Sequence, residues 1–381
     1  MIDLDQQATT PLAPEALEAM LPFLREQHAN PHSPHAAGRR ARAALEAARA
    51  EIAGLCGVAP DWVIFTSGAT EANNLALKGV FGAGAAGGLV TFATEHSCVL
   101  EAARALKGAG VPVSVLPVLP DGMPDMGAYA AALAEGEVAL VSAMRVNNEV
   151  GSIWPIGQLA AVAHAHGALF HCDAAQAFGK IGCRVEEDLG GADLVSLSAH
   201  KAHGPKGIGA LLARPGLDLA PLLDGGGQER FRSGTQSPAL AAGFGAAARL
   251  ARARMADDMA HAAALQQRAL ERLRAAGVRF EVNGPAPGTA ERIATNLSLR
   301  FPGVAAARLI AARRDLMISS GAACSSGAGR PSHVLPALGK GRAEVAETIR
   351  LGWGRYTRAD DIDAGLGAIA EIVLRMQKGG G

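Results

Sequence analysis

Residues 198 to 207 read Ser198-Ala199-His200-Lys201-Ala202-His203-Gly204-Pro205-Lys206-Gly207, and they join two apolar runs, Leu194–Leu197 and Ile208–Leu212. The first run predicts a buried strand, and the glycines and proline predict a tight return into the second run. Lys201 therefore follows a buried strand, an unusual place for a solvated charge. An amine that is held and partly desolvated there is suited to forming an imine. The alternative for this stretch alone is a surface hairpin whose lysines face water.

Apolar runs alternate with helix-like stretches from residue 61 to about residue 235. The predicted strands before the second run above are Val63–Phe65, Leu89–Phe92, Val113–Leu116, Val138–Val141, Ala168–Phe170 and Leu194–Val195. Such alternation implies crossover connections and a mostly parallel sheet, so we expect the α/β class. Ligands of these folds bind beyond the carboxyl ends of the strands, and that is where the polar residues of this chain collect.

A second, smaller unit is expected after the sheet. An alanine-rich helical stretch begins at Ser237-Pro238 and runs to about Ala276, and short predicted strands and helices follow it. We expect an N-terminal arm over residues 1–12 that packs with the small domain, a large domain over 13–250, and a small α+β domain over 251–381.

The composition excludes several classes of function. Lys plus Arg and Asp plus Glu both number 36 in 381 residues, which argues against a broad basic surface for nucleic acid or for an acidic membrane. The five cysteines match no disulfide framework and no zinc spacing, which indicates a reducing compartment. We expect a cytoplasmic protein, because residues 1–5 lack the pattern of a secretory signal. The loop around His32 and His35 is interpreted as a flexible loop, so no metal site is expected.

Two polar segments follow predicted strands in the first half of the chain. In Ser67–Asn74 a glycine turn leads into a helix start, where free N–H groups bind anions and the Thr70 hydroxyl lies beside them. An ordinary helix cap is the alternative there. His96 follows the strand Leu89–Phe92, where an imidazole can stack on a flat ring and move protons. A structural histidine is the alternative for His96.

Two further segments complete a series of polar strand ends. Asn147 and Asn148 follow one strand and can hydrogen-bond a carboxylate or a ring oxygen. Asp173 closes the next strand and would need a cationic partner when buried, a role that a pyridinium nitrogen fills. Gln176 could reach the phenolic oxygen of the same ring. An anion turn, a histidine, an aspartate and Lys201 in this order indicate pyridoxal phosphate, with Lys201 as the Schiff-base lysine.

These segments resemble those of cysteine desulfurases of the NifS/IscS-like kind, which are fold-type I pyridoxal-phosphate enzymes of the class V aminotransferase group. The resemblance covers nearly the whole chain and is carried by Ser67–Asn74, Asn147–Gly151, Asp173–Gln176, Ser198–Gly207, Gly225–Thr235 and Ser319–Ser326. It implies a large domain with a mostly parallel seven-stranded sheet. It also implies that Lys201 forms the Schiff base, Asp173 holds the pyridine nitrogen, His96 stacks on the ring and acts as acid–base for the thiols, and Gln176 meets the phenolic oxygen. The phosphate ligands that it implies are Ala69, Thr70, Ser198 and His200, with Thr235 from the other subunit of a homodimer.

The resemblance also implies the reaction. Cys324 lies among glycines and serines in Ser319–Gly329, a composition that suits a nucleophile which must travel, and its position is that of the family's persulfide carrier. Arg355, assisted by Asn148, is expected to clamp the carboxylate of L-cysteine. The expected products are L-alanine and a Cys324 persulfide, which passes to an acceptor protein for iron–sulfur clusters or other sulfur-containing cofactors. The alternatives are a selenocysteine lyase, an aminotransferase or kynureninase-type enzyme, and a non-catalytic sulfur-transfer protein. Gln6-Gln7 departs from the family pattern in the N-terminal arm.

Overall fold

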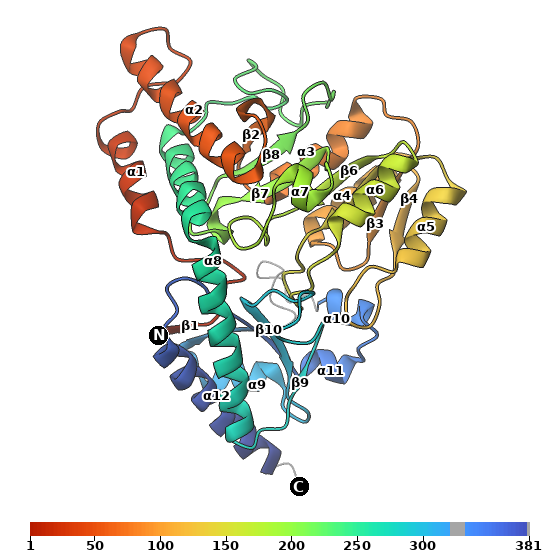
Figure 1. Cartoon of the computed structure of the whole chain (residues 1–381), viewed down its shortest axis with the longest axis vertical. Coiled ribbons are helices and arrows are strands. Elements are labelled where there is room, and N and C mark those ends of the chain that lie inside the picture. The colour runs from red at the N-terminus through yellow and green to blue at the C-terminus, as the bar shows by residue number, and fades with distance from the viewer. Residues whose placement is uncertain (321–331, 379–381) are drawn as a thin grey trace.

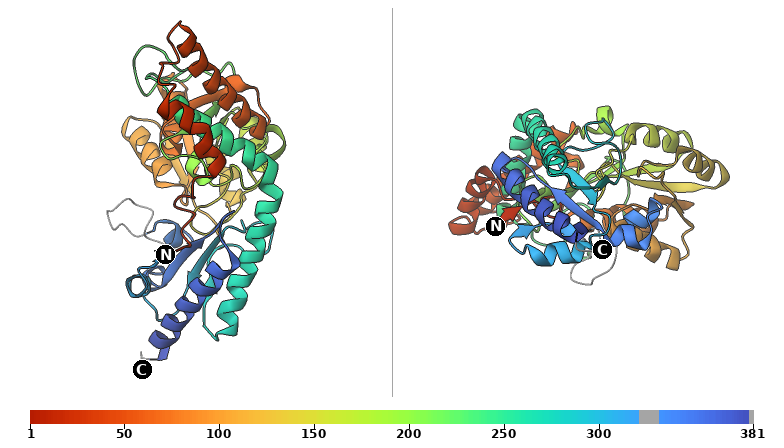
Figure 2. Two further views of the ribbon diagram at one scale, coloured as in Figure 1. Left: turned by 90° about the vertical axis from the view of Figure 1, so that its left-hand side faces the viewer. Right: turned by 90° about the horizontal axis from the view of Figure 1, so that it is seen from below.

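The computed structural model describes residues 1–320 and 332–378. The chain forms a large unit around a seven-stranded sheet and a small unit around a four-stranded sheet (Figure 1). Helix α8 (Pro238–Ala275) runs along one side of both units, as the views of Figure 2 show. None of the helices within the described ranges has the length and hydropathy needed to cross a membrane.

The large sheet has the strand order β2-β8-β7-β6-β5-β3-β4. Neighbouring strands are parallel, except that β8 is antiparallel to both β2 and β7. This confirms the predicted mostly parallel seven-stranded sheet and the tight return after Lys201. The strands are β2 (Val63–Thr66), β3 (Gly88–Phe92), β4 (Val113–Leu116), β5 (Val138–Met144), β6 (Leu169–Asp173), β7 (Leu194–Ser198) and β8 (Gly209–Ala213).

Helices cover both faces of this sheet because its strands are apolar on both sides. Alternate residues of β2 belong to different cores: Val63 and Phe65 pack on one face, and Ile64 packs on the other. Helices α3 (Ala69–Gly82) and α4 (Ser97–Gly108) cover the face of Ile64. The opposite face is covered by α2 (Ala36–Cys56), α5 (Met126–Glu135), α6 (Ile156–Ala165), α7 (Val185–Leu189) and the first half of α8. Helix α1 (Pro14–Arg25) packs on α8.

The small unit is built on an antiparallel sheet in the order β12-β13-β10-β9. Its core lies between this sheet and the helices α8, α9 and α12. The elements are β9 (Glu281–Val282), β10 (Asn296–Arg300), α9 (Ala306–Ala312), β12 (Ser319–Ser320), α10 (Val334–Ala337), α11 (Arg342–Ala346), β13 (Thr348–Gly352) and α12 (Ala359–Lys378). In the apolar stretch that begins at Val278, only Glu281 and Val282 pair with β10.

The N-terminal arm joins both units. Strand β1 (Ile2–Asp3) pairs in parallel with β11 (Leu316–Met317), and Leu4 is fully buried in the core of the small unit. Farther along the arm, the Thr10 N–H donates to the His200 carbonyl at 2.9 Å. The arm thus lies against the chain around Lys201, which sets the position of the site described below.

We predict that Gly209→Ala destabilises the large unit. A Cβ at Gly209 would lie 2.5 Å from the Leu197 carbonyl oxygen and 2.7 Å from Gly68 Cα, both of them backbone atoms. Moving packed backbone costs about 1–3 kcal/mol, so the urea midpoint of unfolding should fall. Gly108→Ala is the matched control, because nothing lies within 4 Å of a Cβ there and its midpoint should not fall. Equal midpoints for Gly209→Ala and the unaltered protein would contradict the prediction.

Candidate active site

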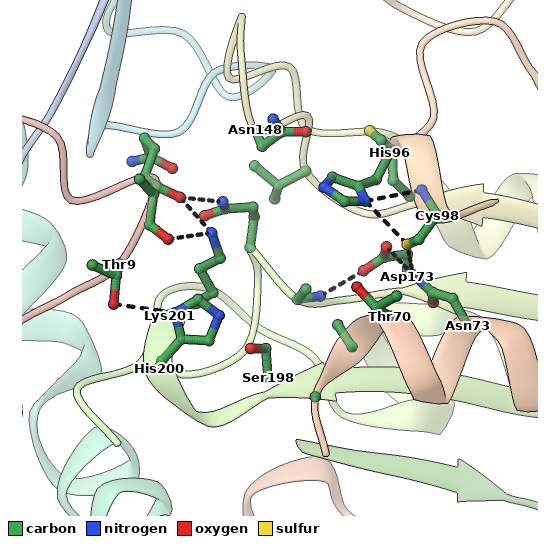
Figure 3. A pocket seen from close by; sticks show the side chains of 18 of the residues that line it. Thr9, Thr70, Asn73, His96, Cys98, Asn148, Asp173, Ser198, His200 and Lys201 are labelled. Carbon is green, nitrogen blue, oxygen red and sulfur yellow. Dashed lines mark hydrogen bonds between the residues drawn. The ribbon is translucent and has the colours of Figure 1, made fainter. Parts of the chain in front are cut away.

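A cavity of about 570 Å³ opens at the carboxyl edge of the large sheet. Its walls come from the ends of β2, β6 and β7, the N-termini of α3 and α4, the N-terminal arm and the start of β12 (Figure 3). Most of the predicted site residues line it: Ala69, Thr70, His96, Asn148, Asp173, Gln176, Ser198, His200 and Lys201. Segments that lie far apart in the sequence therefore meet at one place, as the rule for open α/β sheets requires.

Lys201 ends the short 3₁₀ helix η2 (Ala199–Lys201) that follows β7. Its Nζ donates hydrogen bonds to the carbonyl oxygens of Gln7, at 2.6 Å, and of Ala8, at 2.8 Å. Both acceptors belong to the N-terminal arm, so the amine is held at the cavity wall by main-chain oxygens. Carbonyl acceptors of this kind hold the amine in place and carry no countercharge.

Asp173 closes β6 and is buried. Its Oδ2 accepts from Asn73 Nδ2 at 2.7 Å, and its Oδ1 accepts from the Ala175 N–H at 2.9 Å. In Figure 3 this carboxylate and the Lys201 amine lie on different walls of the cavity. A flat ring between them would have an anion at one end and an amine at the other, which is the arrangement that a pyridoxal ring needs.

One part of the wall is suited to a phosphate group. Ser198 Oγ is buried and has no hydrogen-bond partner among the described residues. The first turn of α3, with Ala69 and Thr70, presents backbone N–H groups that a helix leaves unpaired. The close approach of Gly68 and Gly209 brings this turn against the strand that follows Lys201. A buried hydroxyl without a partner beside a helix N-terminus fits a bound oxyanion.

His96 forms the N-cap of α4. Its Nδ1 accepts from the Cys98 N–H at 3.2 Å and lies 3.0 Å from Cys98 Sγ. Since that N–H can only donate, the proton of the neutral ring is on Nε2. Burial lowers the pKa of His96, and the charge of Lys201 acts in the same direction, although Asp173 opposes both. His96 is therefore a neutral ring at neutral pH, able to stack or to exchange a proton.

The two arginines near the C-terminus occupy different places. Arg355 is buried outside the cavity and donates to Asp258 Oδ2 from Nε at 2.8 Å and from Nη2 at 2.6 Å. This position does not support the carboxylate-binding role that the sequence predicted for Arg355. Arg350 of β13 lines the cavity instead, with Nη1 3.2 Å from the Asn148 carbonyl and Nη2 2.9 Å from Asp5 Oδ1. In the sequence, Arg350 stands between the apolar residues Ile349 and Leu351, and a charge inside an apolar run was a signal for it.

One other predicted residue, Thr235, does not join this wall. Thr235 is exposed and lies outside the cavity of its own chain. Cys324 lies outside the described residues. Sequence reasoning missed Asn73, although this residue stands in the quoted anion turn. It also missed the Gln7 carbonyl, because every residue has a backbone acceptor and no sequence pattern marks this one. Cys98 lines the cavity as well and was not singled out.

Comparison with known proteins agrees with this geometry. The family model for aminotransferase class V matches residues 2–364. The chain is 41% identical over 383 residues to cysteine desulfurase IscS of Rickettsia akari, covering 99% of this chain and 92% of that protein. It is 44% identical over 388 residues to a mitochondrial cysteine desulfurase of Arthroderma benhamiae, covering 99% of this chain and 75% of that protein.

Solved structures of NifS-like proteins and their relatives have the same fold as this chain. A NifS-like protein superposes with a TM-score of 0.90 at 32% identity, covering 98% of this chain and 99% of that one. A structure described as SspA in complex with cysteine superposes with a TM-score of 0.81 at 34% identity, covering 94% and 100% of the two chains. The family match over residues 2–364 agrees with the fold and with the cavity at the sheet edge. This chain therefore belongs to the class V aminotransferase family of pyridoxal-phosphate-dependent enzymes.

Proposed function

We propose that this chain is a cysteine desulfurase, which removes sulfur from L-cysteine with pyridoxal phosphate as its cofactor. The observation that carries the proposal is one cavity that brings together the Lys201 amine, the buried Asp173 carboxylate and an anion cradle at Ser198. The relatives that carry the name cysteine desulfurase match almost the whole of this chain, which favours the same activity here.

Each cavity residue has a role that follows from its position. When bound, pyridoxal phosphate supplies an electron sink for the bonds around the substrate's α-carbon. Asp173 would hold the ring nitrogen protonated, and Ala69, Thr70, Ser198 and His200 would hold the phosphate. His200 suits this place as a neutral donor, because burial lowers its pKa to about 4. The Lys201 amine would carry protons within the cavity.

The carboxylate of the substrate is assigned to Arg350 rather than Arg355. Arg350 reaches the cavity wall beside Asn148, whereas Arg355 donates from Nε and from Nη2 to Asp258. A guanidinium gives two parallel N–H donors to a carboxylate, and this fixes both the position and the rotation of the amino acid.

The sulfur step is assigned to Cys324. Its thiolate would attack the sulfur of L-cysteine, forming an S–S bond as the C–S bond breaks. The electron pair of the broken bond remains on the substrate carbon, which takes up a proton and leaves as L-alanine. His96, neutral and at the cavity wall, would move protons between the thiols. The persulfide would then pass to an acceptor protein for iron–sulfur clusters or other sulfur-containing cofactors.

The same proposal extends to the assembly. Thr235 is exposed in its own chain, which suits a phosphate ligand donated to the other subunit of a homodimer. Four cysteines in the described ranges are free thiols, which supports a reducing compartment such as the cytoplasm. We retain the division into an arm over residues 1–12, a large domain over 13–250 and a small domain over 251–381 as part of this proposal.

Cys324→Ser should separate cofactor binding from sulfur transfer. We expect the variant to keep the visible absorption band of the bound cofactor and to lose persulfide formation, with alanine production from cysteine reduced by ~10²-fold or more. Lys201→Ala should lose the band as well as the activity. Absorption spectra and mass analysis of the cysteine-treated proteins measure both. A persulfide formed at the normal rate by Cys324→Ser would refute the sulfur step.

Arg350→Lys tests the arginine assignment. Losing a bidentate, charge-assisted contact worth about 1.5–3 kcal/mol should raise KM for L-cysteine by about tenfold or more. The visible band should remain, because Arg350 is not assigned to the cofactor. Arg355→Lys is the matched control, and its KM should stay unchanged. A rise in KM confined to Arg355→Lys would return the role to Arg355.

A further inference from the structure

Lys180 is a buried lysine outside every role described so far. It lies in the helical turns that follow β6, and the whole residue is only 8% exposed to solvent. The turn is packed tightly: Gly179 has a φ of 72°, and a Cβ there would lie 3.0 Å from Ala202 and 3.1 Å from Ala251. Lys180 is therefore enclosed between the sheet edge, the chain after Lys201 and helix α8.

The only hydrogen-bond partner of Lys180 Nζ within the described ranges is Gln176 Oε1, at 2.8 Å. The two residues are four apart in a helical turn, so their side chains lie on one face. A buried ammonium is ordinarily matched by a carboxylate. Here the carboxylate at this place, Asp258, is bound by Arg355 instead. Among the described residues, this buried amino group thus has as its hydrogen-bond partner a single amide of the cofactor cavity.

That contact acts together with the Gln7 carbonyl to fix which way the Gln176 amide points. Because Lys180 donates to Oε1, the NH₂ group is on the other side, and its Nε2 donates to the Gln7 carbonyl at 3.0 Å. The same carbonyl accepts from Lys201 Nζ at 2.6 Å. One N–H of Gln176 is used in this way, and the second remains to donate into the cavity. With the amide reversed, the cavity would meet an acceptor instead.

We propose that Lys180 is a positioning residue, which fixes the Gln176 amide so that it donates an N–H to the phenolic oxygen of the bound cofactor. The inference rests on the proposed function and on the expectation from the sequence that Gln176 meets the phenolic oxygen of the cofactor. Lys180 acts through Gln176 and touches neither substrate nor cofactor.

The electrostatic surroundings of Lys180 agree with this role. Burial, followed by the positive charges of Lys201 and Arg350, lowers the pKa of Lys180 to about 7. Both the ammonium and the neutral amine donate hydrogen bonds, so the contact with Gln176 persists on either side of that value. The charged or titratable groups facing Lys180 across the small space of about 20 Å³ beside it are Lys201, His203, Asp258 and Arg355.

The test is the pH titration of the visible absorption band of the holoenzyme. This band reports the proton held between Lys201 and the phenolic oxygen. A donor on that oxygen lowers its proton affinity, and a nearby positive charge does the same. Lys180→Met removes both effects, so we expect the pH midpoint of the band to rise by about one unit.

Lys180→Gln keeps an N–H donor without the charge and should shift the midpoint by less. Lys78→Met, on α3 and away from the cavity, is the control and should leave the midpoint unchanged.

A double-mutant cycle with Gln176→Ala separates positioning from charge alone. If Lys180 acts through Gln176, the shift caused by Lys180→Met should fall to less than half in the Gln176→Ala background. An unchanged midpoint in Lys180→Met, or an equal shift in both backgrounds, overturns the proposal. Should Lys180→Met fail to fold, Lys180→Arg takes its place in the same cycle, because a guanidinium cannot repeat the lysine geometry. An unaltered protein that forms no visible band with pyridoxal phosphate would instead refute the proposed function.

Discussion

The site depends on the parallel pairing of β6 with β7. In this register Asp173 lies opposite Ser196, so the ends of both strands reach the same edge of the sheet. Asp173 is the last residue of β6, and Ser198 is the last of β7, with Lys201 one short 3₁₀ turn beyond. A slip of one residue would turn each of these side chains to the other face. The pairing of β6 with β7 therefore brings three groups to one cavity: the Asp173 carboxylate, the Ser198 hydroxyl and the Lys201 amine.

The antiparallel strand β8 strengthens this constraint. It pairs with both β7 and β2, which places the anion turn at Gly68 beside the chain that leaves Lys201. Gly209 is needed there because its Cα faces Gly68 at a distance that leaves no room for a Cβ. The phosphate end of the cavity and the amine end are thus parts of one packed structure, which is how a site is held to the tolerance that catalysis requires.

Much of this arrangement could be predicted from the sequence. The strands of the large sheet are apolar runs with polar residues after them, and the positions of Asp173, His96 and Lys201 follow from that pattern together with the rule for ligand sites in α/β folds. The orientation of Gln176 could not be predicted, because it depends on Lys180 and on a carbonyl of Gln7 that no side-chain pattern encodes. Arg350 and Arg355 stand in one short motif and differ in their place in the fold: Arg350 lies within β13 and lines the cavity, whereas Arg355 lies beyond the end of β13 and binds Asp258. The two-residue strands β1, β11 and β12 are too short to show any period.

The place of the N-terminal arm has a consequence for the order in which the protein assembles. Residues 2–3 pair with residues 316–317, and Leu4 and Asp5 contact Gly352 through a backbone hydrogen bond and an isolated bridge. Residues 2–5 therefore find their partners only after the chain has been synthesised through residue 352. Until then the Gln7 and Ala8 carbonyls are not positioned for Lys201, so a nascent chain can complete its large sheet and still lack a finished cavity. Competence to bind cofactor in this geometry is thereby tied to synthesis of the chain through β13.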